Sequence, residues 1–190
     1  MEGELSYADV ERARGQGDVD LLIEIVNRAP TGLRVAAARH LGEAGARRAV
    51  SPLVRALRSS DLVLRVASIK ALGSIGGPES ADAVATAGVE NELAIQATAA
   101  VALLRLGDAR ASDILIRLAS REDARSRHSR RWAIRRLAES ATPLDRRTVD
   151  RIVATLSSVD RLRLRGTLAV LRAATTNEAK ETGEIGPART

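Results

Sequence analysis

The side chains best suited to chemistry in this sequence gather in residues 125–136, where six arginines surround a single tryptophan. If the segment is helical, residues spaced by four, such as His128, Trp132 and Arg136, share one face. Guanidinium groups bind carboxylates and phosphates, and an exposed tryptophan flanked by arginines is typical of an interface hot spot. The candidate partner-binding residues are therefore Arg127, His128, Arg131, Trp132, Arg135 and Arg136.

Charge is unevenly distributed along the chain. Residues 1–104 carry 11 basic and 13 acidic side chains, whereas residues 105–172 carry 17 basic and 8 acidic ones. The positive half suits an acidic protein surface or nucleic acid. A solvated face near the end of a repeat stack, or an arginine-rich composition alone, would explain the same residues without a partner. Arg55 and Arg117, two repeat periods apart, are secondary candidates for binding.

Catalytic and metal chemistry have little support in the sequence. Cysteine is absent, which excludes disulfides, thiolate zinc ligands and thiol nucleophiles. His40 and His128 are 88 positions apart, and we expect neither to have a carboxylate partner on its own helix. No G-x-S-x-G elbow occurs, and the glycine-rich residues 73–77 lack the Lys-Ser/Thr of a phosphate-binding loop. We expect no enzymatic activity, cofactor, metal or small-molecule substrate.

The composition favours an all-helical fold. A chain of 190 residues is long enough to bury a sizeable core, and it contains no phenylalanine and only two aromatic residues, Tyr7 and Trp132. Alanine, leucine and valine must fill that core, and alanine, leucine and arginine have high helix propensity. No segment approaches the roughly 18 apolar residues that span a bilayer, and the start Met-Glu-Gly-Glu is unlike a secretory signal. We expect no membrane association and a cytoplasmic location.

The sequence repeats itself with a period of 31 residues. Residues 33–45 read LRVAAARHLGEAG, residues 64–76 read LRVASIKALGSIG, and residues 95–107 read IQATAAVALLRLG, each beginning 31 positions after the last. A degenerate fourth copy at residues 126–138 keeps this register, and a fifth, at residues 162–173, arrives about five residues late. Self-similarity at such a period is typical of stacked repeat architectures.

Each repeat has the pattern of a helical hairpin. Leu33, Ala37 and Leu41 form the buried stripe of a first helix, and Gly45 ends it in a left-handed turn. A second helix then follows, for which Ser51 is the expected N-cap. One hairpin cannot bury both its faces, so it is stable only when stacked. The sequence therefore predicts an all-α fold, a right-handed α-solenoid of stacked antiparallel helix pairs.

Three regions are expected along the chain. Residues 1–32 form N-terminal capping helices, a degenerate first repeat in which Ser6 and Asp9 make a capping box. Residues 33–173 form the repeat solenoid. Residues 174–190 have no apolar period and several helix breakers, so we expect a disordered tail there.

Two residues of the fourth copy depart from the repeat pattern. Equivalent positions in successive copies form a column along the stack. Trp132 falls in the outward-facing column of Lys70, so we expect it to be exposed, or alternatively to lie over the inserted loop near Pro143. Arg130 falls in the buried column of Ala37, so we expect its side chain to bend outward or to pair with an acid. Such divergence is typical of a binding site grafted onto a solenoid, although a terminal cap also diverges for solubility.

Further positions complete the pattern of a known family. The string LRVAAARHLGEAG is followed by Ala49, Pro52, Leu53, Leu57, Asp61 and then LRVAS. Over roughly residues 18–172 this pattern resembles HEAT-like repeats of the phycobilisome-lyase type. In such repeats an acid precedes the first helix and a basic residue lies inside it. The matching positions here, expected to act as caps and intrahelical ion pairs, are Asp61 with Arg65, Asp123 with Arg127, and Asp160 with Arg163.

The resemblance implies a fold and leaves the activity open, because such repeats occur in lyase subunits, adaptors, iron-dependent hydroxylases and assembly scaffolds. The hydroxylases use His-Glu dipeptides as ligands, whereas here Leu41 follows His40 and Ser129 follows His128. We therefore expect a non-enzymatic scaffold or adaptor whose partner is a protein with an acidic surface. The alternative is a nucleic-acid-binding protein that contacts phosphates through its arginines.

Overall fold

The computed structural model describes residues 5–123, 126–140 and 144–181, and within these ranges every regular element is a helix. The prediction of an all-α fold is confirmed. The chain divides into two compact units, residues 1–114 and residues 115–190.

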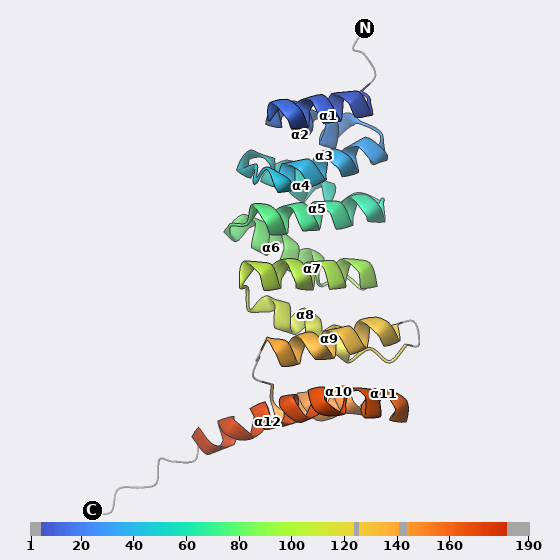
Figure 1. The fold of residues 1–190 in the computed structure, drawn as a ribbon, viewed down its shortest axis with the longest axis vertical. Helices are drawn as coiled ribbons and strands as arrows, with labels where there is room; N and C mark the ends of the chain where they lie inside the picture. The colour runs from blue at the N-terminus through green and yellow to red at the C-terminus, as the bar shows by residue number, and fades with distance from the viewer. Residues whose placement is uncertain (1–4, 124–125, 141–143, 182–190) are drawn as a thin grey trace, which may run out of the picture. The chain divides into compact units, whose positions relative to one another are not determined.

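The first unit is a two-layered stack of helix hairpins. Its elements are α1 (Tyr7–Gln16), α2 (Val19–Arg28), α3 (Thr31–Glu43), the 3-10 turn η1 (Arg47–Ala49), α4 (Val50–Ala56), α5 (Leu62–Ile75), α6 (Pro78–Ala87) and α7 (Leu93–Leu106). Helices α1, α3, α5 and α7 pack successively in one layer, and α2, α4 and α6 form the other (Figure 1). Helix α8 (Arg110–Ala119) contains the division between the units.

The repeat columns form the core of this unit. Leu41, Leu72 and Leu103, which occupy one position in three successive copies, are all fully buried. Small residues beside this column let the helices approach closely. A Cβ atom at Gly42 would lie 2.7 Å from the Cα of Ala71 on the next helix, a separation that packed structures do not tolerate.

Most helix ends follow the local sequence signals. Gly45, Gly76 and Gly107 have φ angles of 61°, 77° and 68°, the left-handed region that glycine adopts without strain. Ser6 and Asp9 form the expected capping box at the start of α1.

The second helix of the first full repeat begins differently from the prediction. Ser51 is not an N-cap, because the η1 turn leads directly into α4 at Val50, and Ala49 occupies the cap position without a side-chain hydrogen bond. A 3-10 turn satisfies terminal amide groups through the backbone itself, so no capping side chain is needed.

The second unit contains the last turns of α8 and then α9 (Arg127–Glu139), α10 (Arg146–Ala154), α11 (Ser158–Arg163) and α12 (Arg165–Glu181). Helix α12 packs against α9, α10 and α11. The expected register of the fifth copy is wrong. Leu162, the expected counterpart of Leu33, is 73% exposed, whereas Leu164 and Leu168 are buried.

The C-terminal segment is partly helical. Helix α12 continues to Glu181, so the first part of the tail expected from residue 174 onward is helix, and residues 182–190 lie outside the described residues. No helix in the described parts of the chain is long and apolar enough to span a bilayer.

Candidate partner-binding surfaces

Helix α9 carries the basic residues singled out from the sequence. Four of them are exposed to solvent, and we call these four the α9 basic face: Arg127, His128, Arg135 and Arg136. Trp132 is half-buried, so the expectation that its column would leave it fully outward is wrong. An indole ring is large, so neighbouring atoms cover part of it even at an outward-facing position. Pro143, the alternative neighbour proposed for it, lies outside the described residues.

Arg130 is buried and binds the main chain. It is 4% exposed, and its Nη1 atom donates to the carbonyl oxygens of Arg121, at 2.5 Å, and Thr155, at 3.0 Å. Both expectations for this residue, an outward bend or an acidic partner, are wrong. Thr155 ends α10, where helix carbonyls lack intrahelical partners, so the guanidinium group satisfies one of them. Arg130 thus joins the segment after α8 to the end of α10.

Arg131 also has an internal partner. Its Nη1 atom lies 3.2 Å from Oδ1 of Asp160, a carboxylate that is 2% exposed. Burial raises the pKa of Asp160, but the Ser157 hydroxyl and the charges of Arg131 and Arg127 outweigh burial and leave the pKa below its ordinary value. The predicted intrahelical pair with Arg163 is replaced by this interhelical one. Arg131 therefore holds α11 against α9.

The segment before α9 forms a small polar network. Asp123 accepts hydrogen bonds from the Ser126 backbone amide at 2.9 Å and the Ser126 hydroxyl at 2.6 Å, and from Nε of Arg121 at 3.0 Å. The Ser126 hydroxyl is the main cause of the lowered pKa of Asp123. The acid expected to pair with Arg127 pairs with Arg121 instead. Internal bonds therefore explain Arg130, which departs from the repeat pattern, and also Ser126, which stands where the first copy has Leu33.

In the first unit, too, an arginine pairs with a different acid from the one predicted. Asp61 caps α5 by accepting from the Val63 and Leu64 amides, as predicted. The ion pair expected between Asp61 and Arg65 does not form, because Arg65 reaches Glu90, 25 positions along the chain. Here the acid acts as a cap, and the arginine inside the helix bonds to a residue on another segment.

His40 is buried, with 6% of its surface exposed. Its Nδ1 atom lies 2.9 Å from Oε2 of Glu43, so the expectation that it lacks a carboxylate partner on its helix is wrong. Three residues separate the two on α3, a spacing at which helical side chains meet. No cluster of three or more potential metal ligands occurs among the described residues.

The secondary candidates lie on other helices. Arg55, on α4, is exposed, and its Nη2 atom is 3.4 Å from Oδ1 of Asn27. Arg117, on α8, is exposed in the other compact unit.

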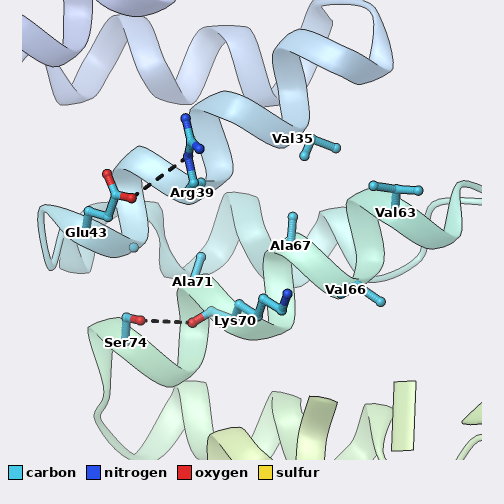
Figure 2. Close-up of a pocket in the computed structure, with 10 residues that line it drawn as sticks. Val35, Arg39, Glu43, Val63, Val66, Ala67, Lys70, Ala71 and Ser74 are labelled. Atoms are coloured by element: carbon cyan, nitrogen blue, oxygen red, sulfur yellow. Dashed lines mark hydrogen bonds and ion pairs between the residues drawn. The ribbon is translucent and has the colours of Figure 1, made fainter. Parts of the chain in front are cut away.

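One surface feature escaped the sequence interpretation. A groove of about 330 Å³ lies between α3 and α5 (Figure 2). The signal that could have revealed it is a column outside the buried stripe, where Val35 and Val66 place apolar side chains on the partly exposed side in two successive copies. The residues that line this groove are Val35, Arg39, Gly42, Glu43, Val63, Val66, Ala67, Lys70, Ala71 and Ser74.

Stacked helix hairpins with a 31-residue period define a helical-repeat protein. Residues 19–92 match the family model of HEAT repeats, which confirms the HEAT-like resemblance for that part of the chain. No curated protein matches in sequence.

Among solved structures, an engineered protein from the Northeast Structural Genomics Consortium is 18% identical, covers 88% of this chain and 83% of its own, and has a TM-score of 0.47. The complex of CpcE and CpcF of phycocyanin lyase from Nostoc sp. PCC7120 is 17% identical, covers 87% of this chain and 86% of its own, and has a TM-score of 0.33. At scores this low, neither similarity transfers an activity or a partner to this chain.

Proposed function

We propose that this protein is a non-enzymatic interaction module whose α9 basic face binds an acidic surface of a protein partner. The observation that carries this proposal is the exposure of all four members of that face on one helix. Arg136 pairs with Glu139 at 2.7 Å, whereas no carboxylate within the described ranges pairs with Arg135. An exposed pair of this kind contributes little to stability and is readily exchanged for a partner's carboxylate.

The structure changes which residues the proposal includes. Arg131 was a candidate from the sequence, but its guanidinium group neutralises the buried Asp160, so it supports the helix rather than facing a partner. Trp132, half-buried among the arginines, offers a rigid aromatic edge of the kind that anchors interfaces. The proposed surface is therefore smaller than the sequence pattern indicated.

A protein partner is favoured over nucleic acid because the basic half has one aromatic residue, Trp132, on which a base could stack. Each guanidinium group can donate two parallel hydrogen bonds to one carboxylate, which gives geometric selectivity as well as charge neutralisation. The nucleic-acid alternative predicts binding that falls steeply with salt.

The test uses two double charge reversals with matched surroundings. Arg135→Glu with Arg136→Glu alters the α9 basic face. Arg47→Glu with Arg48→Glu is the control, because both arginines of that adjacent pair are exposed as well and Arg48 pairs with Asp20 at 2.7 Å, as Arg136 does with Glu139.

Affinity capture from an extract of the native host, followed by mass spectrometry, identifies proteins retained by the wild-type chain. Binding is then measured with the purified captured protein. We expect the α9 variant to lose that protein and the control to keep it. Equal capture by both variants contradicts the proposal. Fluorescence anisotropy with labelled duplex DNA and single-stranded RNA tests the nucleic-acid alternative. Tight binding that depends strongly on salt, and that the α9 variant abolishes, would establish that alternative.

A further inference from the structure

The groove between α3 and α5 has an apolar side and a charged side. Val35, Val63, Val66 and Ala67 form the apolar side. Val63 is 61% exposed, which leaves the groove open to solvent. Figure 2 shows Val35 on α3 and Val63 on α5 at the same end of the groove. Its volume of about 330 Å³ is at the small end of the range of roughly 300–1,000 Å³ found for ligand pockets.

The charged side of the groove has a surplus of positive charge. Its one carboxylate, Glu43, is already engaged, since Oε2 lies 2.9 Å from Nδ1 of the buried His40 and Oε1 lies 3.9 Å from Nε of Arg39. In the part of the chain that the structure describes, no carboxylate pairs with the ammonium group of Lys70. The Lys70 side chain lies along α5 on the exposed surface (Figure 2). The groove therefore combines its apolar side with a cation, Lys70, whose charge no carboxylate among its described neighbours neutralises.

The floor of the groove is rigid because of how the two helices meet. At one end Gly42 packs directly on Ala71, where an added Cβ would lie 2.7 Å from the Cα of Ala71. This close approach fixes α3 against α5, so the surface is formed before any ligand arrives. A preformed surface binds with a smaller loss of conformational entropy than one that must be ordered.

We propose that this groove binds a linear peptide segment of a partner protein, in which an aliphatic side chain is adjacent to an aspartate or glutamate. The aliphatic side chain packs on Val35, Val63 and Val66, and the carboxylate pairs with Lys70 and, secondarily, Arg39. The exposed rim favours a linear segment over a small molecule, because small-molecule sites usually enclose most of the ligand surface. This site is distinct from the α9 basic face, and either proposal can fail without affecting the other.

The test is a selection of random peptides displayed on phage, performed on the full wild-type chain. We expect the enriched peptides to share an aliphatic residue next to an acid. Their affinities are then measured by fluorescence anisotropy against Val63→Ser and Lys70→Glu, each of which we expect to weaken binding by about tenfold or more. Matched controls are Val101→Ser, an exposed helical valine outside the groove, and Arg58→Glu, an exposed arginine outside it. The variant Arg135→Glu with Arg136→Glu should bind these peptides as the wild type does.

Thermal melting checks that each variant is folded, which we expect because both altered side chains are exposed. The proposal is overturned if no peptide is enriched, if the enriched peptides lack acids, or if the groove variants bind them unchanged. Light scattering adds one further outcome. A dimer of the wild-type chain that Val63→Ser dissociates would make the groove a contact between two copies and would also overturn the proposal.

Discussion

The repeats that contain α5 and α9 use the same column for different purposes. At the position of Ala37, α5 has Ser68, which is fully buried and donates to the carbonyl oxygen of Leu64 on its own helix at 2.8 Å. Helix α9 has Arg130, which donates to carbonyl groups of two other segments. A buried column thus accepts a charged residue when carbonyl groups of other segments, here those of Arg121 and Thr155, accept its hydrogen bonds.

This comparison also separates two kinds of arginine on α9. Arg130 and Arg131 are bound within the second unit, by carbonyl groups and by Asp160. Arg135 and Arg136 are exposed. Dense positive charge in a sequence is therefore no measure of the charge that is available to a partner, since part of it is consumed by the fold.

Placing the arginine of this column into α5, by Ser68→Arg, gives the largest expected effect on stability. Ser68→Arg places a much larger, charged side chain at a fully buried position, where the serine hydroxyl donates to the Leu64 carbonyl oxygen of its own helix. An uncompensated buried charge costs several kcal/mol, so we expect a loss of about 4 kcal/mol or more, enough to unfold much of the protein. Circular dichroism during urea denaturation measures it. A midpoint near the wild-type value would show that the two columns are interchangeable.

The common core of the repeats gives the next largest effect. Leu72 is fully buried in the column that Ile134 continues on α9. Leu72→Ala removes a large apolar side chain and leaves a cavity, and we expect a loss of about 2–4 kcal/mol in the free energy of unfolding. Urea denaturation again provides the measurement, and a change near zero would mean that the repeat register is wrong.

Removing the buried arginine should have a smaller effect than inserting one. Arg130→Ala leaves the carbonyl groups of Arg121 and Thr155 without this donor, and we expect a loss of about 1–3 kcal/mol. The control is Arg135→Ala on the same helix, which is exposed and should change stability by less than about 0.5 kcal/mol. Equal losses for the two variants, measured by urea denaturation, would contradict a structural role for Arg130.

The sequence was sufficient for features that depend on local order. Helical periodicity placed Leu41, Leu72 and Leu103 in one buried column, and glycines marked the ends of helices. The capping box of Ser6 and Asp9 also involves neighbours three residues apart. Such features are predictable because their partners lie within one helical turn, and the missed His40–Glu43 pair could have been found in the same way.

Features that depend on packing between helices could not be predicted from the sequence. The same spacing rules assigned Arg65 to Asp61 and Asp160 to Arg163, yet Arg65 reaches Glu90 and Asp160 reaches Arg131. A flexible arginine can pair with a carboxylate near its own helix or with one on another segment, and the packing of these segments decides which pair forms. The groove between α3 and α5 was missed for this reason too, because two surfaces form it.

The smallest expected effect concerns the pH dependence of the Arg131 pair. The pKa of Asp160 is lowered from its ordinary value of 3.8. A carboxyl group with a lowered pKa in the folded state stabilises the protein at pH values above its ordinary pKa, and this stabilisation is lost as the pH falls through the lowered value. Asp160→Asn should therefore be less stable than the wild type at neutral pH, and the difference should shrink below about pH 4.

Urea denaturation at several pH values from neutral to strongly acidic tests this expectation directly. The other aspartates with lowered pKa values, such as Asp9 and Asp145, are present in both proteins, so their contributions cancel in the difference. Asp113→Asn, at an exposed position on α8, is the control for removing a negative charge. A difference that stays constant with pH would mean that the charge of Asp160 contributes nothing and that the carboxyl group acts through its shape alone. The Arg131 charge would then be free of an internal role, and the α9 basic face would have to include it.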